Sequence, residues 1–252
     1  MIAYPLTRPH RIQLARVFPP PHVDISIDCV VEDQMGKAFV DSVENPQLFM
    51  IELDGFFCYF AGDMTTSVGR AFVSKTPHGR MLMAGTDGWQ EVVQAVFSTD
   101  QLITLKRYTY ASDSLSLEHV QKLIAGNPHT QNVRRIDAAL ASSDIPYFEI
   151  GSFESPQDFE QRGIGFCLMR EGKSLGVAYS SLVCSRAIEV SIVVDPDHYR
   201  QGIATALACH LLQWCLENHV SPHWDAANEE SCYLAEKLGY TKQGEYGAFY
   251  LK

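Results

Sequence analysis

The chain has 252 residues, and its content of 46% hydrophobic and 20% charged residues is typical of a soluble globular protein. Its formal net charge of −10 argues against nucleic acid or an anionic membrane surface as a partner, because both attract basic proteins. The plainer interpretation of the same charge is solubility, and it would also favour a cationic substrate. The length suits one large domain or two small ones.

The opening segment "MIAYPLTRPHRIQLARVFPPP" predicts neither a signal peptide nor a transmembrane span, because it has no continuous apolar run and is broken by prolines. The proline run at residues 17–24 predicts the end of an opening arm. The chain has 7 cysteines, an odd number, and no CxxC pair, which predicts reduced thiols and a cytoplasmic protein.

Residues 30–125 alternate short β-like runs with helical stretches. The runs at 48–53 and 56–62 predict a hairpin, because Asp54-Gly55 between them is a favoured turn dipeptide. Farther along, we expect a strand over 80–86, a helix over 88–97, a strand over 101–110 and a helix from Ser116 to Gly126.

The polar, proline-bearing stretch at residues 127–131 predicts a domain boundary. It divides the chain into an N-terminal α/β region, 1–126, of unknown role and a second domain, 127–252. For the second domain we expect a mixed α/β sheet fold. Its predicted elements are a helix over 132–142, strands over 164–172, 174–183 and 187–194, a helix over 202–219, a strand over 221–226, a helix over 229–239 and two β runs within 242–251.

The stretch "RQGIAT", residues 200–205, follows a strand directly and opens a helix. Small residues at such a turn let an anion reach the unpaired amides of the helix N-terminus. A helix-entry turn explains Gly202 equally well when that residue is taken alone. Other phosphate-binding fingerprints are absent from the sequence, since it has no GxxxxGK[ST] motif and "GIGFCL" opens a strand.

Two longer blocks, "EVSIVVDPDHYRQGIATAL" and "WDAANEESCYLAEKLGY", resemble the GNAT superfamily of N-acetyltransferases. In the first block, residues 199–204 occupy the family's pattern of Arg or Gln, two residues, Gly, one residue, and Gly or Ala. In the second block the matching residues are Asn228, Ser231, Leu234, Ala235, Lys237, Gly239 and Tyr240. The second block also resembles a subgroup that includes the acetyltransferase giving self-resistance to zwittermicin A.

The resemblance implies acetyl-CoA as the co-substrate and no metal. The pantetheine arm would pair with the strand backbone, as an added strand does, and the pyrophosphate would meet the amides of the turn. Gly202 and Ala204 would be small because a side chain would block that approach. The implied binding residues are Ile192, Val193, Val194, Arg200, Gln201, Gly202, Ile203, Ala204, Thr205 and Asn228, the last of which also suits an ordinary N-cap.

The implied reaction is direct attack of a small-molecule primary amine on the thioester, which needs a base. Glu189 opens an otherwise apolar strand and is our candidate for that base, the plainer alternative being an ion-paired glutamate at a strand end. The family often has a tyrosine at Ala235 to protonate the leaving thiolate, and alanine cannot do this. We therefore assign the proton to Ser231 or solvent, because Tyr233 faces another side of the helix.

Two further questions stay open on the sequence alone. Ala235 and Tyr199, both departures from the family pattern, leave a CoA-binding regulatory module with little catalysis as the alternative function. The N-terminal region has three candidate roles: shaping the acceptor pocket, being a degenerate copy of the same fold, or forming a homodimer.

Overall fold

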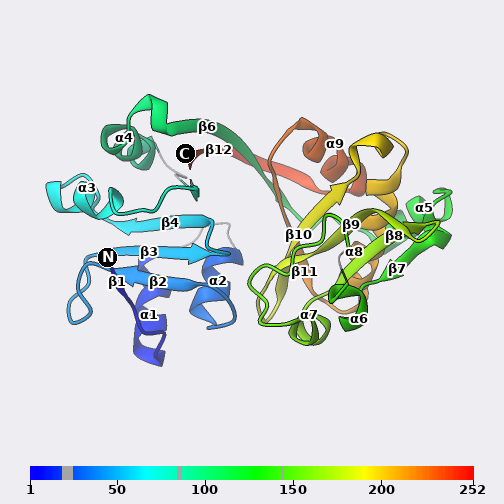
Figure 1. Ribbon diagram of the computed structural model, residues 1–252, viewed down its shortest axis with the longest axis horizontal. Helices are drawn as coiled ribbons and strands as arrows, with labels where there is room; N and C mark the ends of the chain where they lie inside the picture. The colour runs from blue at the N-terminus through cyan, green and yellow to red at the C-terminus, as the bar shows by residue number, and fades with distance from the viewer. Residues whose placement is uncertain (19–24, 84–86, 144) are drawn as a thin grey trace. The chain divides into compact units, whose positions relative to one another are not determined.

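The structure is a computed structural model that describes residues 1–18, 25–83, 87–143 and 145–252 (Figure 1). The chain forms two compact units, which we call unit 1 (Met1–Tyr108 with Gly244–Lys252) and unit 2 (Thr109–Gln243). Both units combine helices with antiparallel and parallel strand pairs, so the predicted mixed α/β fold is confirmed. The assignment of roles to residues 1–126 and 127–252 stays a prediction. Among the described residues, no helix has the length and apolar content needed to cross a membrane.

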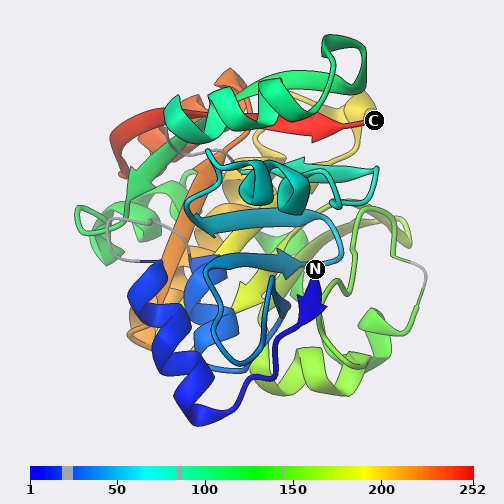
Figure 2. The same cartoon turned by 90° about the vertical axis from the view of Figure 1, so that its left-hand side faces the viewer.

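Unit 1 has the sheet order β1-β2-β3-β4-β5-β12, with all pairs antiparallel except β4 and β5. Leu48 and Met50 belong to a core shared with α3 and α4, whereas Phe49 between them contacts the ring of Tyr4. Figure 2 shows α1 and α2, in dark blue, side by side. The elements are β1 (Ile2–Ala3), α1 (Arg8–Val17), α2 (Ile25–Val31), β2 (Lys37–Val40), β3 (Leu48–Leu53), β4 (Phe57–Gly62), α3 (Ser67–Val73), β5 (Arg80–Leu82), α4 (Asp87–Val96), η1 (Thr99–Gln101), and most of β6 (Leu102–Ala111) and β12 (Thr241–Leu251).

The predicted hairpin of unit 1 is confirmed. Leu53 pairs with Phe57, and the amide of Phe56 donates to the carbonyl of Leu53 at 2.8 Å. Asp54 and Gly55 have φ values of 54° and 58°, the left-handed conformation that this turn requires at both central positions.

Unit 2 has the strand order β11-β10-β9-β8-β7, in which only β10 and β11 are parallel. Helix α8 is buried along the face made by Ile203, Leu207 and Leu211, as its apolar spacing predicts. The elements are α5 (Leu117–Ala125), η2 (Thr130–Asn132), β7 (Val133–Arg135), α6 (Ala138–Ala141), α7 (Pro156–Arg162), β8 (Gly165–Arg170), β9 (Lys173–Val183), β10 (Ala187–Val194), η3 (Pro196–His198), α8 (Ile203–Glu217), β11 (Ser221–Ala226) and α9 (Glu229–Leu238).

Two predicted elements are wrong. The helix expected over 132–142 is divided: Val133–Arg135 pairs with β8, and a helix of one turn follows only after Asp137 caps it by accepting from the amide of Leu140 at 2.8 Å. The two β runs expected within 242–251 form a single strand, β12. The strand expected over 80–86 is β5, which ends at Leu82; residues 84–86 and most of the proline run lie outside the described residues.

Candidate active site

Strand β10 has one fully paired edge and one partly paired edge. It pairs with β9 from Ile188 to Val194, but its parallel register with β11 covers only Ala187–Glu189 within the described chain. The register with β9 shifts between Glu189 and Val190, so an irregularity that bends a strand coincides with the end of pairing. The predicted residues Ile192 and Val193 follow this point, and Val193 is 37% exposed despite being apolar.

The turn between β10 and α8 uses two left-handed residues. Tyr199 is extended, with φ −61° and ψ 152°, and Arg200 follows with φ 59°. That sequence of conformations is typical of a type II turn, whose third position favours glycine or asparagine. A residue with a long side chain in this conformation is uncommon, and such outliers concentrate at functional sites.

Gly202 is the N-cap of α8, with φ 87°. A Cβ placed on Gly202 would meet only Asn127 Nδ2, at the ordinary contact distance of 3.5 Å. The backbone conformation, rather than crowding by the protein itself, therefore requires glycine at this position.

The first turn of α8 has unsatisfied amides. In the described part of unit 2, the other α-helices each have a side chain that caps them, from Ser116, Asp137, Ser155 and Asn228. Gly202 offers no side chain, and among the described residues no acceptor is found for the amides of Ile203, Ala204 and Thr205. These donors, together with the positive end of the helix dipole, suit an anion.

Helix α9 lies against the same turn. Lys237 Nζ donates to Thr205 Oγ1 at 3.1 Å, a contact that the sequence pattern did not predict. At the other end of α9, Asn228 Oδ1 accepts from the amide of Ser231 at 2.9 Å, so Asn228 is a helix cap. Ser231 Oγ also accepts from Trp224 Nε1 at 3.1 Å, which leaves the hydroxyl hydrogen of Ser231 available to donate. Tyr233 is 71% exposed.

Glu189 lies close to a buried tyrosine. Burial raises the pKa of Tyr240 well above its ordinary value, and the charges of Cys215 and Glu189 add to this effect. The Tyr240 hydroxyl donates to the carbonyl of Pro222 at 3.1 Å. Glu189 itself is half-buried, at the last paired position before the edge of β10 opens.

A cavity of about 530 Å³ lies in the segment that leads to α7, and its lining includes Ile145, Phe148 and Glu154. The Phe148 ring lies 5.1 Å from that of Tyr179, which pairs with Ser191 of β10. The cavity wall therefore contacts β9, the strand that pairs with β10. No sequence pattern indicates this cavity, because irregular backbone lines most of it.

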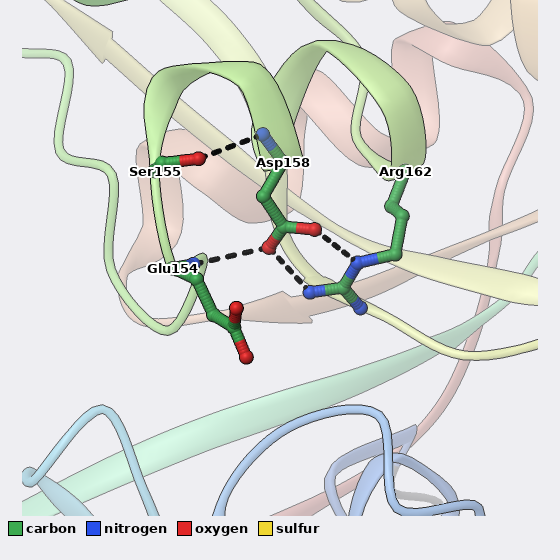
Figure 3. Close-up of polar contacts among 4 residues, drawn as sticks. All are labelled: Glu154, Ser155, Asp158 and Arg162. Carbon is green, nitrogen blue, oxygen red and sulfur yellow. Dashed lines mark hydrogen bonds and ion pairs between the residues drawn. The ribbon is translucent and has the colours of Figure 1, made fainter.

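Figure 3 shows the polar contacts at the start of α7, where Glu154 and Ser155 also line the cavity. Ser155 Oγ caps the amide of Asp158 at 3.1 Å, and the Asp158 carboxylate accepts two bonds of 2.6 Å from the Arg162 guanidinium. The Glu154 carboxylate points away from this ion pair in Figure 3, although its amide donates to Asp158 at 3.0 Å. Glu154 is exposed and lines the cavity, so it supplies a negative charge there.

Tyr147 is a second feature that the sequence did not reveal. It has φ 71°, which is rare for a bulky residue, and is 37% exposed. Desolvation and the charges of Asp195 and Asp197 raise the pKa of Tyr147 above its ordinary value. Tyr147 therefore lies near the acidic residues that follow β10.

The pattern of GNAT acetyltransferases matches residues 17–249, nearly the whole chain. The chain belongs to the GNAT acetyltransferase family. It is 23% identical over 228 residues to an uncharacterized N-acetyltransferase, YdfB, of Bacillus subtilis, and the match covers 85% of each chain. A crystal structure of a GCN5-related N-acetyltransferase-like protein from Streptococcus suis superposes with a TM-score of 0.85 and 25% identity, over 97% of this chain and 99% of that one.

A shorter match involves the ribosomal protein bS18-alanine N-acetyltransferase of Escherichia coli. It is 33% identical over 85 residues, covering 32% of this chain and 57% of that protein. Membership of the GNAT family makes this chain an N-acetyltransferase. The resemblance to the zwittermicin A resistance subgroup stays a prediction.

Proposed function

We propose that this GNAT protein transfers an acetyl group from acetyl-CoA to a primary amine of a small molecule, by direct attack of the amine. The observation that carries the proposal is the uncapped start of α8 beside the open edge of β10. An anion and an extended amide chain are what these two features can bind, and acetyl-CoA has both.

Acetyl-CoA supplies an activated acetyl group as a thioester. The backbone of Ile192, Val193 and Val194 would pair with its pantetheine arm along the open edge of β10. The amides of residues 200–205 would hold the diphosphate, and the Arg200 guanidinium would add charge. Asn228 fits this role through its amide nitrogen only, because its Oδ1 caps α9.

Two residues of unit 2 would handle protons. Glu189 would accept a proton from the ammonium form of the acceptor, either directly or through a water molecule. Ser231 or solvent would protonate the departing thiolate, which is consistent with a Ser231 hydroxyl that already accepts from Trp224. A backbone N–H of Val193 or Val194 would stabilise the developing oxyanion.

The cavity in the segment leading to α7 supports a small, cationic acceptor. Its volume of about 530 Å³ is within the range of small-molecule sites, and Glu154 gives it a negative charge. The relative from Escherichia coli is named for acetylating a protein alanine, so a protein amine is the competing acceptor class.

The test is release of free thiol from acetyl-CoA over a panel of polyamines, amino sugars and amino acids. We expect turnover with at least one small amine, and a loss of at least about 100-fold in kcat for Glu189→Gln, in the range that acid–base groups contribute. Glu217→Gln is the matched control, because Glu217 is exposed at the far end of α8.

Two other outcomes would favour other functions. Thermal stabilisation by acetyl-CoA without turnover on any amine would favour the CoA-binding module. A protein with neither stabilisation nor turnover would contradict the proposal.

A further inference from the structure

The turn that begins α8 is contacted by the side chains of Asn127 and His129, and His129 is in turn contacted by Arg170. Asn127 Nδ2 donates to the carbonyl of Gly202 at 2.9 Å, and His129 Nε2 lies 2.9 Å from the carbonyl of Gln201. The Asn127 side chain also contacts the backbone of His129, because Asn127 Oδ1 accepts from the His129 amide at 2.9 Å. The polar stretch at residues 127–131 therefore holds two consecutive carbonyls of the turn.

The partners of His129 define its tautomer. A carbonyl oxygen can only accept, so Nε2 carries the hydrogen that bonds to Gln201. An Arg170 N–H lies 3.3 Å from His129 Nδ1, and a guanidinium can only donate, so Nδ1 is the acceptor. A single neutral form of the ring satisfies both contacts.

Holding the carbonyls also orients the amides. In a trans peptide the C=O and the following N–H point in opposite directions. The carbonyl of Gln201 is directed at His129, so the following amide, of Gly202, is directed away from His129. In the same way, the carbonyl of Gly202 is directed at Asn127, and the amide of Ile203 is directed away from it. The carbonyl of Gly202 also accepts from Ala206 within α8, whereas among the described residues the carbonyl of Gln201 has only His129.

We infer that His129, supported by Asn127 and Arg170, is a positioning residue that aims the amides of the α8 turn at the diphosphate of acetyl-CoA. This inference rests on the proposed function. Arg200 and Gly202, on either side of Gln201, are both left-handed, and for Arg200 this conformation is uncommon, so contacts from outside the turn help to maintain it. His129 supplies such a contact.

The test compares three variants for binding of acetyl-CoA and of acetyl-pantetheine, which lacks the diphosphate. We expect His129→Ala to weaken acetyl-CoA binding about tenfold, to raise KM for acetyl-CoA with little change in kcat, and to leave acetyl-pantetheine binding unchanged. His129→Gln retains a side-chain N–H donor, and we expect it to restore most of the lost affinity. His119→Ala is the matched control, because His119 Nε2 makes an equivalent 2.9 Å contact with the carbonyl of Lys237 at the end of α9.

The outcomes separate this inference from the proposed function. If the wild type binds acetyl-CoA and folded His129→Ala binds it equally well, the positioning role is wrong and the proposed function stands. Equal losses for acetyl-CoA and acetyl-pantetheine would also overturn the role, because they would indicate general damage. If His129→Ala does not fold, the same comparison with Asn127→Leu decides. A wild type that binds no acetyl-CoA would overturn both.

Discussion

At Gly202, two reasons for a glycine can be separated: the backbone conformation of the turn and the space needed for a ligand. The φ of 87° at Gly202 excludes ordinary side chains, whereas the protein leaves room for a Cβ. The turn therefore places two constraints on this residue. One is the left-handed conformation, which other tight turns share, and the other is close approach of a diphosphate, which only the proposed function requires. Gly172 in the β8–β9 hairpin has the same conformational requirement but lies outside the proposed coenzyme site. Its φ is 80°, and nothing lies within 4 Å of a Cβ placed there.

We therefore expect Gly202→Ala and Gly172→Ala to destabilise the fold by similar amounts, about 1 kcal/mol, since each places alanine in a left-handed conformation. Only Gly202→Ala should raise KM for acetyl-CoA, by about tenfold. Chemical denaturation and steady-state kinetics on both variants measure the two effects. An unchanged KM in Gly202→Ala would mean that the glycine serves the turn and not the coenzyme.

At the scale of elements, the start of α7 depends on an ion pair beside the cavity. Hydrogen bonds from the Arg162 guanidinium lower the pKa of Asp158 below its ordinary value, and the amide of Glu154 contributes to the same shift. The folded state therefore binds the proton on Asp158 less tightly than the unfolded state does. The stabilisation is fully present above the unfolded pKa of about 4 and is lost as pH falls through the lower, folded-state pKa.

We expect Asp158→Asn to lower the free energy of unfolding by about 1 kcal/mol at pH 7, because the side chains of Asp158 and Arg162 are 19% and 29% exposed. The difference from wild type should shrink as pH falls below about 4. Urea denaturation at several pH values measures this change. Glu160→Gln, on the same helix but exposed, is the control, and an Asp158→Asn effect that is constant with pH would contradict the assignment.

Elements with their own start and stop signals could be predicted from sequence. Examples are the Asp54-Gly55 hairpin, the α5 helix between Ser116 and Gly126, and α8 with its apolar face. The helix predicted over residues 132–142 is wrong because tertiary pairing outweighs local helical propensity there. Val133–Arg135 pairs with the edge of strand β8, and a partner so far away in the chain cannot be recognised from local sequence.

The same division applies to the candidate site. The α8 turn follows from a local motif, so the sequence identified it and the structure gives it uncapped amides. His129, Tyr147 and the cavity were missed, because their roles depend on backbone atoms or charges far away in the chain. Nothing in the stretch at 127–131 distinguishes a linker from a segment that holds Gln201.

At the scale of the whole molecule, the two units share a succession of strands and α-helices, apart from α5, which precedes β7 and has no counterpart among the described residues of unit 1. In unit 1 the order is β1-α1-α2-β2-β3-β4-α3-β5-α4 before β6, and in unit 2 it is β7-α6-α7-β8-β9-β10-α8-β11-α9 before β12. The pairings also correspond, since only β4–β5 and β10–β11 are parallel within the described pairs. This correspondence favours the degenerate copy among the three candidate roles of the N-terminal region.

The turn of unit 1 that corresponds to residues 195–202 is closed by its own side chains. Asp63 Oδ1 accepts from the amide of Thr65 at 3.1 Å, and Thr66 Oγ1 accepts from the amide of Gly69 at 3.0 Å. The hydrogen bonds from Thr65 lower the pKa of Asp63, so this carboxylate is ionised at neutral pH and repels a diphosphate. A Cβ on Gly69 would lie 2.3 Å from Met64 Cα, so the backbone of this turn is closely packed against itself.

We therefore expect each chain to bind about one acetyl-CoA, through unit 2 alone, because the α3 turn of unit 1 is capped by Thr66 and carries the Asp63 carboxylate, which repels a diphosphate. Isothermal titration calorimetry measures the stoichiometry directly. Gly202→Glu places a carboxylate at the turn of unit 2 and should remove all binding, whereas Asp63→Asn should leave the stoichiometry unchanged. Two sites in the wild type, or residual binding in folded Gly202→Glu, would mean that unit 1 keeps a coenzyme site despite its capped turn.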